Sequence, residues 1–189
     1  IAGSGVSDKE LPASFILPED RIPTVRDQKS YGACVGHAIA SVVGIFYGAE
    51  FGGEKLMSPW YIYGNPACRN GYDGYGMFVE DAIDGVRKSG TVPLEYFDVH
   101  MEAPGIIEAV ESRPELAEIA LPYKIKSYLE IPMYAMLKKR SDTIKQALIT
   151  YQSPVVIASK RYFGESHCVI VIGWDKNDRF IFQNSWGED

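Results

Sequence analysis

At residues 28–38 the sequence reads Gln-Lys-Ser-Tyr-Gly-Ala-Cys-Val-Gly-His-Ala, a polar turn punctuated by glycine that runs directly into an apolar segment. Cys34 stands at the junction. The unpaired amide groups and the positive dipole end at the start of a helix favour an anion, so this thiol should ionise more readily than a free cysteine. Because the thiolate is the nucleophilic form of cysteine, the stretch predicts a reactive residue at a helix start.

The segment after Cys34 has the spacing of an amphipathic helix. Its apolar residues lie three positions and one position apart in alternation, namely Val35, Ala38, Ile39, Val42, Val43 and Phe46. We expect this helix to be the buried central one and to end near Gly48. A lone cysteine is more often a small buried hydrophobe than a nucleophile, so a catalytic Cys34 requires a base and an orienting group elsewhere.

Composition limits the class of protein. The chain has 189 residues, of which 46% are hydrophobic, which fits one globular domain or two lobes that share a cleft. No apolar run approaches the roughly 20 residues of a membrane span, so a soluble protein is expected. A net charge of −6 and a pI near 5.1 disfavour a nucleic-acid partner. Residues 1–10 lack periodicity and are expected to be a flexible leader or a propeptide remnant.

The cysteines and histidines form no recognisable framework. Three cysteines cannot all pair, so at least one of Cys34, Cys68 and Cys168 is a free thiol. No CxxC pair occurs, and the three histidines form no array of metal-ligand spacing with the cysteines. We therefore expect neither a metal site nor a cofactor.

Helical signals dominate the first two-thirds of the chain. Serine followed by proline predicts a short helix from Ser58, and apolar periodicity predicts another from Phe78 that Gly90 ends. Short helical turns are expected over 105–111 and 114–120. A later helix, capped by Ser141 or Asp142, carries its apolar residues on one side, namely Ile144, Ala147, Leu148 and Tyr151.

The last third of the chain has the residue pattern of β-strands. Strands are predicted at 155–158, 168–172 and 179–183, and the last two should pair as an antiparallel hairpin that turns at 175–178. Helices followed by strands indicate an α+β chain with a helical lobe against a sheet lobe.

Two polar residues flank this hairpin. His167 comes directly before one strand and Asn184 directly after the other, nearly equidistant from the turn, so their side chains should lie close together. A side-chain amide can hold an imidazole in one orientation. If this edge faces Cys34, the chain has a nucleophile, a base and an orienter. The Gln28 amide and the Cys34 backbone N–H would then form an oxyanion hole.

These residues together resemble the papain-like cysteine proteases, of the papain and cathepsin type. The matches are Gln28 followed by Gly32-Ala33-Cys34, then His167 opening an apolar strand, then residues 183–187, Gln-Asn-Ser-Trp-Gly. The resemblance runs in outline from Leu11 to Gly187. It implies a two-lobe α+β fold, in which a central helix starts at the nucleophile and an antiparallel sheet or barrel lobe lies across an active-site cleft.

The resemblance also assigns roles to residues. It implies Cys34 as nucleophile, His167 as base and acid, Asn184 as orienter and Gln28 as oxyanion donor, while Trp186 shields the Asn–His hydrogen bond from water. The expected catalytic domain is 11–189, with a helical lobe over about 28–120 and a sheet lobe over about 121–189 plus the N-terminal segment.

Further residues are candidates for binding a peptide. The glycine-rich loop with Gly74 and Gly76 lies where the family binds extended peptide by its backbone, although an ordinary surface loop explains it equally well. Ala158 and Cys168 are similar to positions that line the pocket for the substrate's second side chain, and could equally be core residues.

The sequence departs from the family pattern in several places. Tyr31 stands where secreted members have a disulfide cysteine, which leaves Cys68 without an evident partner. His37 stands where an aromatic residue is usual, and a core histidine is a better explanation for it than a second titrating group. The chain reaches Asp189 where family members continue with more sheet, and the connection from Ala158 to His167 is short, so bacterial or viral minimal versions match more closely.

The sequence indicates the location of the protein and its partners only in broad terms. Without the family disulfides the protein is expected to be cytoplasmic, particle-associated or secreted from a microbe. The expected partner is a peptide or protein substrate, and an inhibitory propeptide outside residues 1–189 could be another.

The predicted activity is endopeptidase cleavage through an acyl-enzyme. One alternative is the same scaffold used for transpeptidation, isopeptide cleavage or cell-wall amide hydrolysis. Another is a module that binds extended peptide without cutting it.

Overall fold

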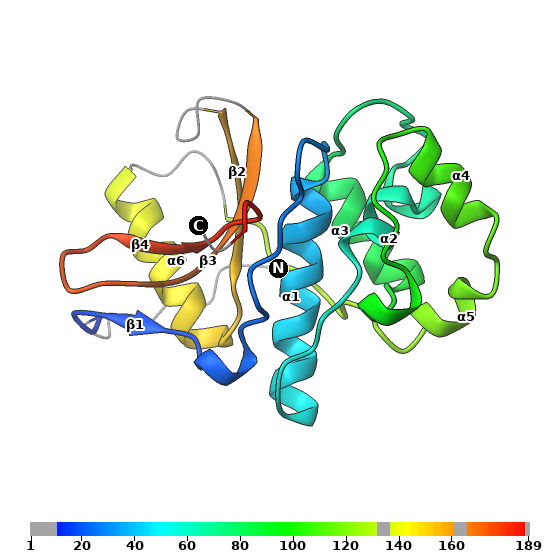
Figure 1. The fold of residues 1–189 in the computed structure, drawn as a ribbon. Helices are drawn as coiled ribbons and strands as arrows, with labels where there is room; N and C mark the ends of the chain where they lie inside the picture. Colours follow the sequence, from blue (N-terminus) through cyan, green and yellow to red (C-terminus); the bar gives the residue numbers. More distant parts are fainter. Residues whose placement is uncertain (1–10, 132–136, 161–165, 188–189) are drawn as a thin grey trace.

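The computed structural model describes residues 11–131, 137–160 and 166–187, so the predicted leader at 1–10 lies outside the described residues. The long helix α1 (Cys34–Phe51) stands between a sheet on one side and a group of shorter helices on the other (Figure 1). This arrangement confirms the predicted α+β fold with two lobes. The α-helices and strands of the described chain are α1 (Cys34–Phe51), α2 (Pro59–Gly64), α3 (Val79–Ser89), α4 (Gly105–Glu111), α5 (Leu116–Ala120), α6 (Leu137–Tyr151), β1 (Phe15–Ile16), β2 (Val155–Ser159), β3 (His167–Trp174) and β4 (Phe180–Gln183).

Helix α1 is buried over most of its circumference because both lobes pack on it. It contacts β3 on one side and α2 and α3 on the other. By length and composition alone α1 could cross a membrane, but 61% of it is buried inside the protein, as is typical of a core helix. The predicted buried face is confirmed except at Phe46, which is 38% exposed, while Ile45 is buried in its place.

The predicted end of α1 at Gly48 is wrong, because the helix continues to Phe51 and ends at Gly52 in the left-handed region with φ 76°. Gly48 serves a different purpose. A Cβ at this position would lie 2.8 Å from the carbonyl oxygen of Gly53, so the missing side chain lets the chain fold back against the helix.

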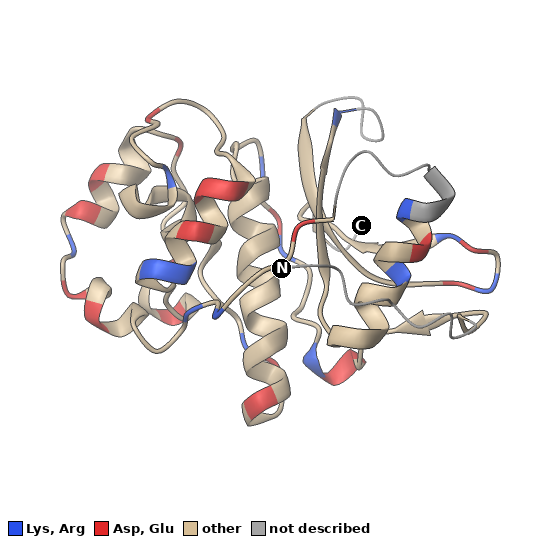
Figure 2. Ribbon diagram, turned by 180° about the vertical axis from the view of Figure 1, so that it is seen from behind, with Lys and Arg blue, Asp and Glu red and all other residues tan. Residues whose placement is uncertain are grey.

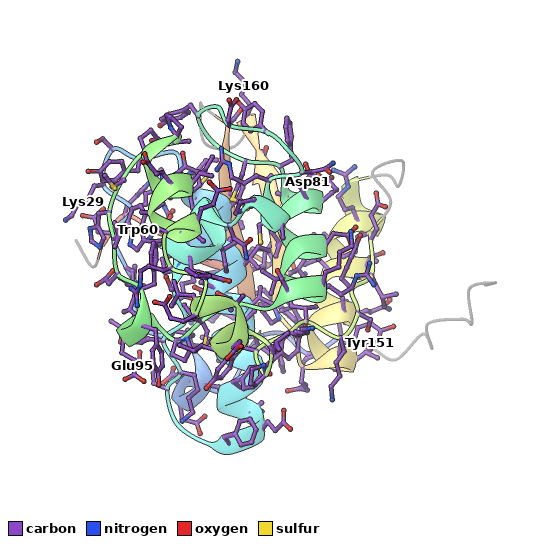
Figure 3. All side chains as sticks on the ribbon, turned by 90° about the vertical axis from the view of Figure 1, so that its right-hand side faces the viewer. Lys29, Trp60, Asp81, Glu95, Tyr151 and Lys160 are labelled. Carbon is purple, nitrogen blue, oxygen red and sulfur yellow. The ribbon has the colours of Figure 1, made fainter. Side chains whose placement is uncertain are left out.

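The helical lobe is built from short helices whose ends follow the predicted signals. Ser58 caps α2 by accepting a hydrogen bond from the Tyr61 N–H, and Gly90 ends α3 with φ 81°. Single-turn 3-10 helices add Pro66–Cys68 and Leu94–Tyr96 to this lobe, and Glu19–Arg21 to the N-terminal segment. A second core forms here around Trp60, which Figure 3 shows within the lobe and which is fully buried.

The sheet lobe is organised on β3, which pairs antiparallel with β1, β2 and β4. All eight residues of β3 are buried because α1 and α6 pack against it, which explains its continuous apolar sequence. The predicted hairpin is confirmed as β3 and β4, with a bulge between Val171 and Gly173. A bulge bends a strand locally, and here a Cβ at Gly173 would lie 2.2 Å from the Phe15 carbonyl oxygen.

Helix α6 differs from its prediction at both ends. It begins at Leu137, so Ser141 and Asp142 lie inside the helix and do not cap it. Ile144 and Leu148 are buried as expected, but Tyr151 is 58% exposed at the C-terminal end.

Charged residues are spread over both lobes (Figure 2). Acidic residues recur along α3, α4 and α5, and of these three helices only α3 also carries basic residues, Arg87 and Lys88 in its last turn.

Candidate active site

Cys34 is the first residue of α1, as the sequence predicts. Cys34 is partly exposed and forms no disulfide, and the first turn of α1 carries no acidic residue that would oppose an anion there. The preceding residue, Ala33, offers no side-chain cap to the first amide groups of the helix. The helix terminus therefore directs its positive end toward a thiol that solvent can reach.

Cys34 lies beside the start of β3. The pKa of the neighbouring Cys168 thiol is raised chiefly by burial, and a second contribution comes from the charge of Cys34. This interaction is between the first residue of α1 and β3, the strand that begins at His167. Two segments that are more than a hundred residues apart in sequence therefore meet here.

His167 and Asn184 form a side-chain pair at the edge of the sheet. The His167 Nε2 lies 2.7 Å from the Asn184 Oδ1. The same Asn184 oxygen accepts a hydrogen bond of 2.8 Å from the Ser185 backbone N–H. Because a backbone N–H can only donate, the Asn184 atom is the oxygen, and His167 must donate to it from a protonated Nε2.

The strand pairing of the sheet brings His167 and Asn184 close together, although the two residues are not paired with each other. β3 and β4 pair as far as Ile170 with Gln183, and His167 itself pairs with Ser159 of β2. Asn184 lies one residue beyond the last β3–β4 pair, so its side chain reaches across to the imidazole. The expectation that the two side chains lie close together is confirmed.

Trp186 covers the imidazole of His167. The two rings stack with centroids 4.6 Å apart and planes inclined by 22°. Trp186 itself is half exposed, so its ring lies at the surface against the imidazole.

Gln28 is fixed by the segment that follows Asn184. Its side-chain oxygen accepts a 2.5 Å hydrogen bond from the Ser185 hydroxyl, and its Nε2 donates to the Tyr31 carbonyl over 2.8 Å. An isolated bridge between Asp27 and Trp186 continues the contact along the backbone. The amide of Gln28 is thereby buried and held in one orientation beside the turn that leads into α1.

The glycine-rich loop abuts the turn before Cys34. A Cβ at Gly32 would lie 2.7 Å from the Gly76 backbone nitrogen, so the two loops touch through their backbones. Gly76 has φ 77° and open space where a side chain would stand. Gly74 lies two residues earlier in the same loop. Whether these glycines bind substrate stays a prediction.

The other predicted binding residues differ in exposure. Ala158 is exposed on β2 and pairs with Cys168 on β3, whose side chain is 2% exposed and belongs to the main core. Their role as pocket residues also stays a prediction. A small cavity of about 20 Å³ does lie beneath Asn184, and Cys168, His37 and Arg26 are among its lining residues.

His37 is a buried histidine of the core, which agrees with the interpretation favoured from sequence. Its Nδ1 lies 3.0 Å from the Ala33 carbonyl oxygen, and its ring packs edge-on against Trp60. Burial is the main reason that its pKa falls to about 4, so the ring is neutral at neutral pH. In the described residues, no group of three His, Cys, Asp or Glu side chains could hold a metal ion.

Several polar contacts around the site have no clear signal in the sequence. Ser185 orients Gln28, and the Glu102 carboxylate accepts a 2.9 Å hydrogen bond from the Gly32 N–H. Arg69 binds carbonyl groups of the glycine-rich loop. Glu102 and Arg69 lie in irregular segments, where periodicity gives no information about contacts.

Known structures share this fold. Xylellain, a cysteine protease from Xylella fastidiosa, superposes with a TM-score of 0.73 at 22% identity over 94% of this chain and 76% of its own. Digestive procathepsin L 3 of the Tenebrio molitor larval midgut gives 0.73 at 16% identity over 96% and 62%. The cysteine protease CMS1MS2 of Carica candamarcensis, solved in complex with E-64, gives 0.68 at 18% over 94% and 84%. No protein-family model and no curated protein matches the sequence. The fold is that of the papain-like cysteine proteases.

Proposed function

We propose that residues 11–189 form the catalytic domain of a cysteine endopeptidase that hydrolyses peptide bonds through Cys34, His167 and Asn184. The observation that carries the proposal is the 2.7 Å His167–Asn184 hydrogen bond on the strand whose next residue, Cys168, belongs to the core cluster against which Cys34 packs. Nucleophile, base and orienter then act as one unit. The shared fold with cysteine proteases supports the same activity.

In the resting enzyme Cys34 is a thiolate and His167 an imidazolium. The helix terminus and the positive imidazolium both stabilise the negative sulfur, and the thiolate in turn stabilises the cation. The Asn184 Oδ1 accepts a hydrogen bond from the Nε2–H group of His167 in either state, so the ring keeps its orientation while Nδ1 gains and loses its proton.

Attack of the Cys34 sulfur on the substrate carbonyl forms a C–S bond and a tetrahedral oxyanion. The Cys34 backbone N–H and the Gln28 Nε2 donate hydrogen bonds to that oxygen. Gln28 is suited to this role because Ser185 fixes its oxygen and Tyr31 accepts one of its two N–H groups, which directs the other. Donors held in advance need no reorganisation as the charge develops.

Collapse of the intermediate breaks the C–N bond. His167 gives its Nδ1 proton to the leaving amine, and an acyl-enzyme remains on Cys34. A water molecule then loses a proton to the neutral His167 as it attacks the thioester, and the C–S bond breaks to release the acid. Trp186 excludes solvent from the His167–Asn184 hydrogen bond throughout the cycle.

The test compares wild type with Cys34→Ala and Cys34→Ser on a denatured protein mixture, with the cut positions read by mass spectrometry. Wild type should cleave internal peptide bonds, and E-64, the compound bound in the Carica protease structure, should block cleavage at one equivalent. Both variants should fold and lose turnover. Full activity in Cys34→Ala, or labelling by E-64 elsewhere than Cys34, would overturn the proposal.

A further inference from the structure

Arg69 is one of the largest side chains that are fully buried in the protein, with 1% of its surface exposed. It directly follows the 3-10 helix Pro66–Cys68 and precedes the glycine-rich loop. Burial lowers the pKa of its guanidinium, and nearby Tyr72 and Asp73 oppose that shift. A guanidinium keeps its charge in proteins, and a buried charge is costly unless hydrogen bonds satisfy it, so the local structure must provide acceptors.

Those acceptors are backbone carbonyls, three of them in the loop itself. Nε donates to the Tyr72 carbonyl over 2.7 Å, and Nη2 donates to the carbonyls of Gly74 over 2.5 Å and Gly76 over 3.0 Å. Nη1 donates over 2.7 Å to the carbonyl of Tyr63, at the end of α2. One side chain therefore joins α2 to three points along the loop.

Aromatic rings complete the environment of the guanidinium. Its central carbon lies 4.9 Å from the Tyr63 ring centroid and 5.6 Å from that of Tyr72. The Tyr63 hydroxyl accepts a 3.3 Å hydrogen bond from the Gly76 N–H, and the Tyr72 hydroxyl donates to the Tyr75 carbonyl over 2.9 Å. These contacts hold the loop in one conformation although its three glycines, Gly71, Gly74 and Gly76, would otherwise leave it with a large conformational freedom.

Arg69 holds a loop that contacts the turn before Cys34, so it can influence the surroundings of the thiol. Gly76 contacts Gly32, two residues before the nucleophile, and the Tyr75 hydroxyl donates to the Ser30 carbonyl over 3.4 Å. A displacement of the loop would change where an extended peptide lies relative to the sulfur.

We infer that Arg69 is a positioning residue that sets the conformation of the glycine-rich loop for binding the substrate backbone. This inference rests on the proposed peptidase function. Because the carbonyls of Gly74 and Gly76 both bind Arg69, the loop turns them inward. The open face of Gly76, where no atom lies near the position of a Cβ, is left to meet the backbone of a peptide.

Lysine cannot replace this arrangement. An ammonium group carries the same charge, but it is a compact point donor and lacks the planar fork that reaches carbonyls in several directions. Arg69→Lys therefore preserves charge and removes geometry, and Arg69→Met removes both. Arg87, an exposed arginine on α3 that pairs with Asp84, gives a matched control as Arg87→Met.

The experiment measures two reactions of Cys34. One is cleavage of a fluorogenic peptide long enough to cross the loop, and the other is alkylation by iodoacetamide, which is too small to need the loop. For Arg69→Lys and Arg69→Met we expect KM to rise about tenfold or more with a smaller change in kcat, because a misplaced substrate loses binding interactions. The alkylation rate and its pH profile should stay within about twofold of wild type. Hydrogen exchange in residues 71–77 should accelerate in both variants.

The controls separate the two proposals. Arg87→Met should match wild type in every measurement. An unchanged KM in Arg69→Lys, a parallel loss of alkylation and cleavage, or failure of both Arg69 variants to fold would overturn the role of Arg69. A wild-type protein that cleaves no peptide would instead overturn the peptidase function, and the exchange measurement would still report whether Arg69 holds the loop.

Discussion

The Ser185 hydroxyl donates a 2.5 Å hydrogen bond to the side-chain oxygen of Gln28, across 157 positions of sequence. The contact connects the turn before α1 with the segment that carries Asn184. It also fixes which end of the Gln28 amide is left for other contacts, because the oxygen is already engaged. In the proposed mechanism, this one hydroxyl couples the orientation of the oxyanion donor, Gln28, to the segment that carries Asn184, the orienter of the base.

Ser185→Ala tests this coupling. Loss of the hydroxyl lets the Gln28 amide rotate, so kcat for peptide cleavage should fall about threefold to tenfold with little change in KM, since the interaction concerns the developing oxyanion. Iodoacetamide alkylation of Cys34 should be unaffected. Ser112→Ala, which removes an exposed hydroxyl bonded to the Ala109 carbonyl, should leave both rates unchanged. A slower alkylation in Ser185→Ala would mean that the hydroxyl acts on the thiolate instead.

The order in which the three cysteines react is a second prediction. Cys34 is partly exposed at a helix terminus, whereas Cys68 and Cys168 are buried. Burial raises the pKa of Cys68 to about 12 and that of Cys168 further. Peptide mapping after brief treatment of the native protein with iodoacetamide should find label on Cys34 alone, and all three sites should react after unfolding. Equal, slow labelling of the three thiols in the native protein would favour a module without catalysis.

His37 predicts a loss of stability in acid. Its pKa in the folded protein is about 4, below the ordinary 6.5. Between these two pH values the His37 imidazole is therefore protonated in the unfolded chain and neutral in the folded protein. Stability therefore falls as the pH drops from about 6.5 to about 4, by about 3 kcal/mol from this group. Urea unfolding of His37→Phe should show a flatter pH dependence over this window.

The control for this experiment is His100→Gln. His100 is exposed and pairs with Asp98, and its charge is only a minor cause of the lowered pKa of His37, so its removal should leave most of the acid slope in place. If His37→Phe retains the full wild-type slope, other groups cause the acid sensitivity.

Gly32→Ala tests the contact between the two loops. The added Cβ would lie 2.7 Å from the Gly76 nitrogen, a backbone atom that cannot swing away, so the loops must separate. We expect a cost of about 1–3 kcal/mol in unfolding free energy and a rise in KM. Gly105→Ala at the start of α4 meets only the Met101 side chain at 3.5 Å, and should be neutral or slightly stabilising. A Gly32→Ala protein with wild-type KM would show that the loops move apart without effect.

Local patterns in the sequence predicted much of the site. The start of α1 at Cys34, the β3–β4 hairpin and the nearness of His167 to Asn184 all follow from periodicity and from the distance to a turn. These features depend on neighbours along the chain, which is the information that a single sequence carries best.

The wrong or missing predictions concern residues whose structure depends on packing against segments that are distant in the sequence. A glycine often ends a helix, which favours an end at Gly48. Instead, its missing side chain leaves room for residues 52–53, which fold back against the helix. Phe46 matches the apolar stripe, yet the lobes close around Ile45 instead. The contacts of Arg69 depend on a loop conformation that has no period, so no pattern could have indicated them.

The guanidinium of Arg69 has a consequence for how this protein tolerates reductant. In the described chain none of the three cysteines forms a disulfide, and the loop beside Cys34 is held by hydrogen bonds from Arg69 to backbone carbonyls. Dithiothreitol, added to keep the nucleophile in its thiol form, therefore has no bridge to cleave. Reducing conditions that keep the Cys34 thiol unoxidised should leave the conformation of this loop unchanged.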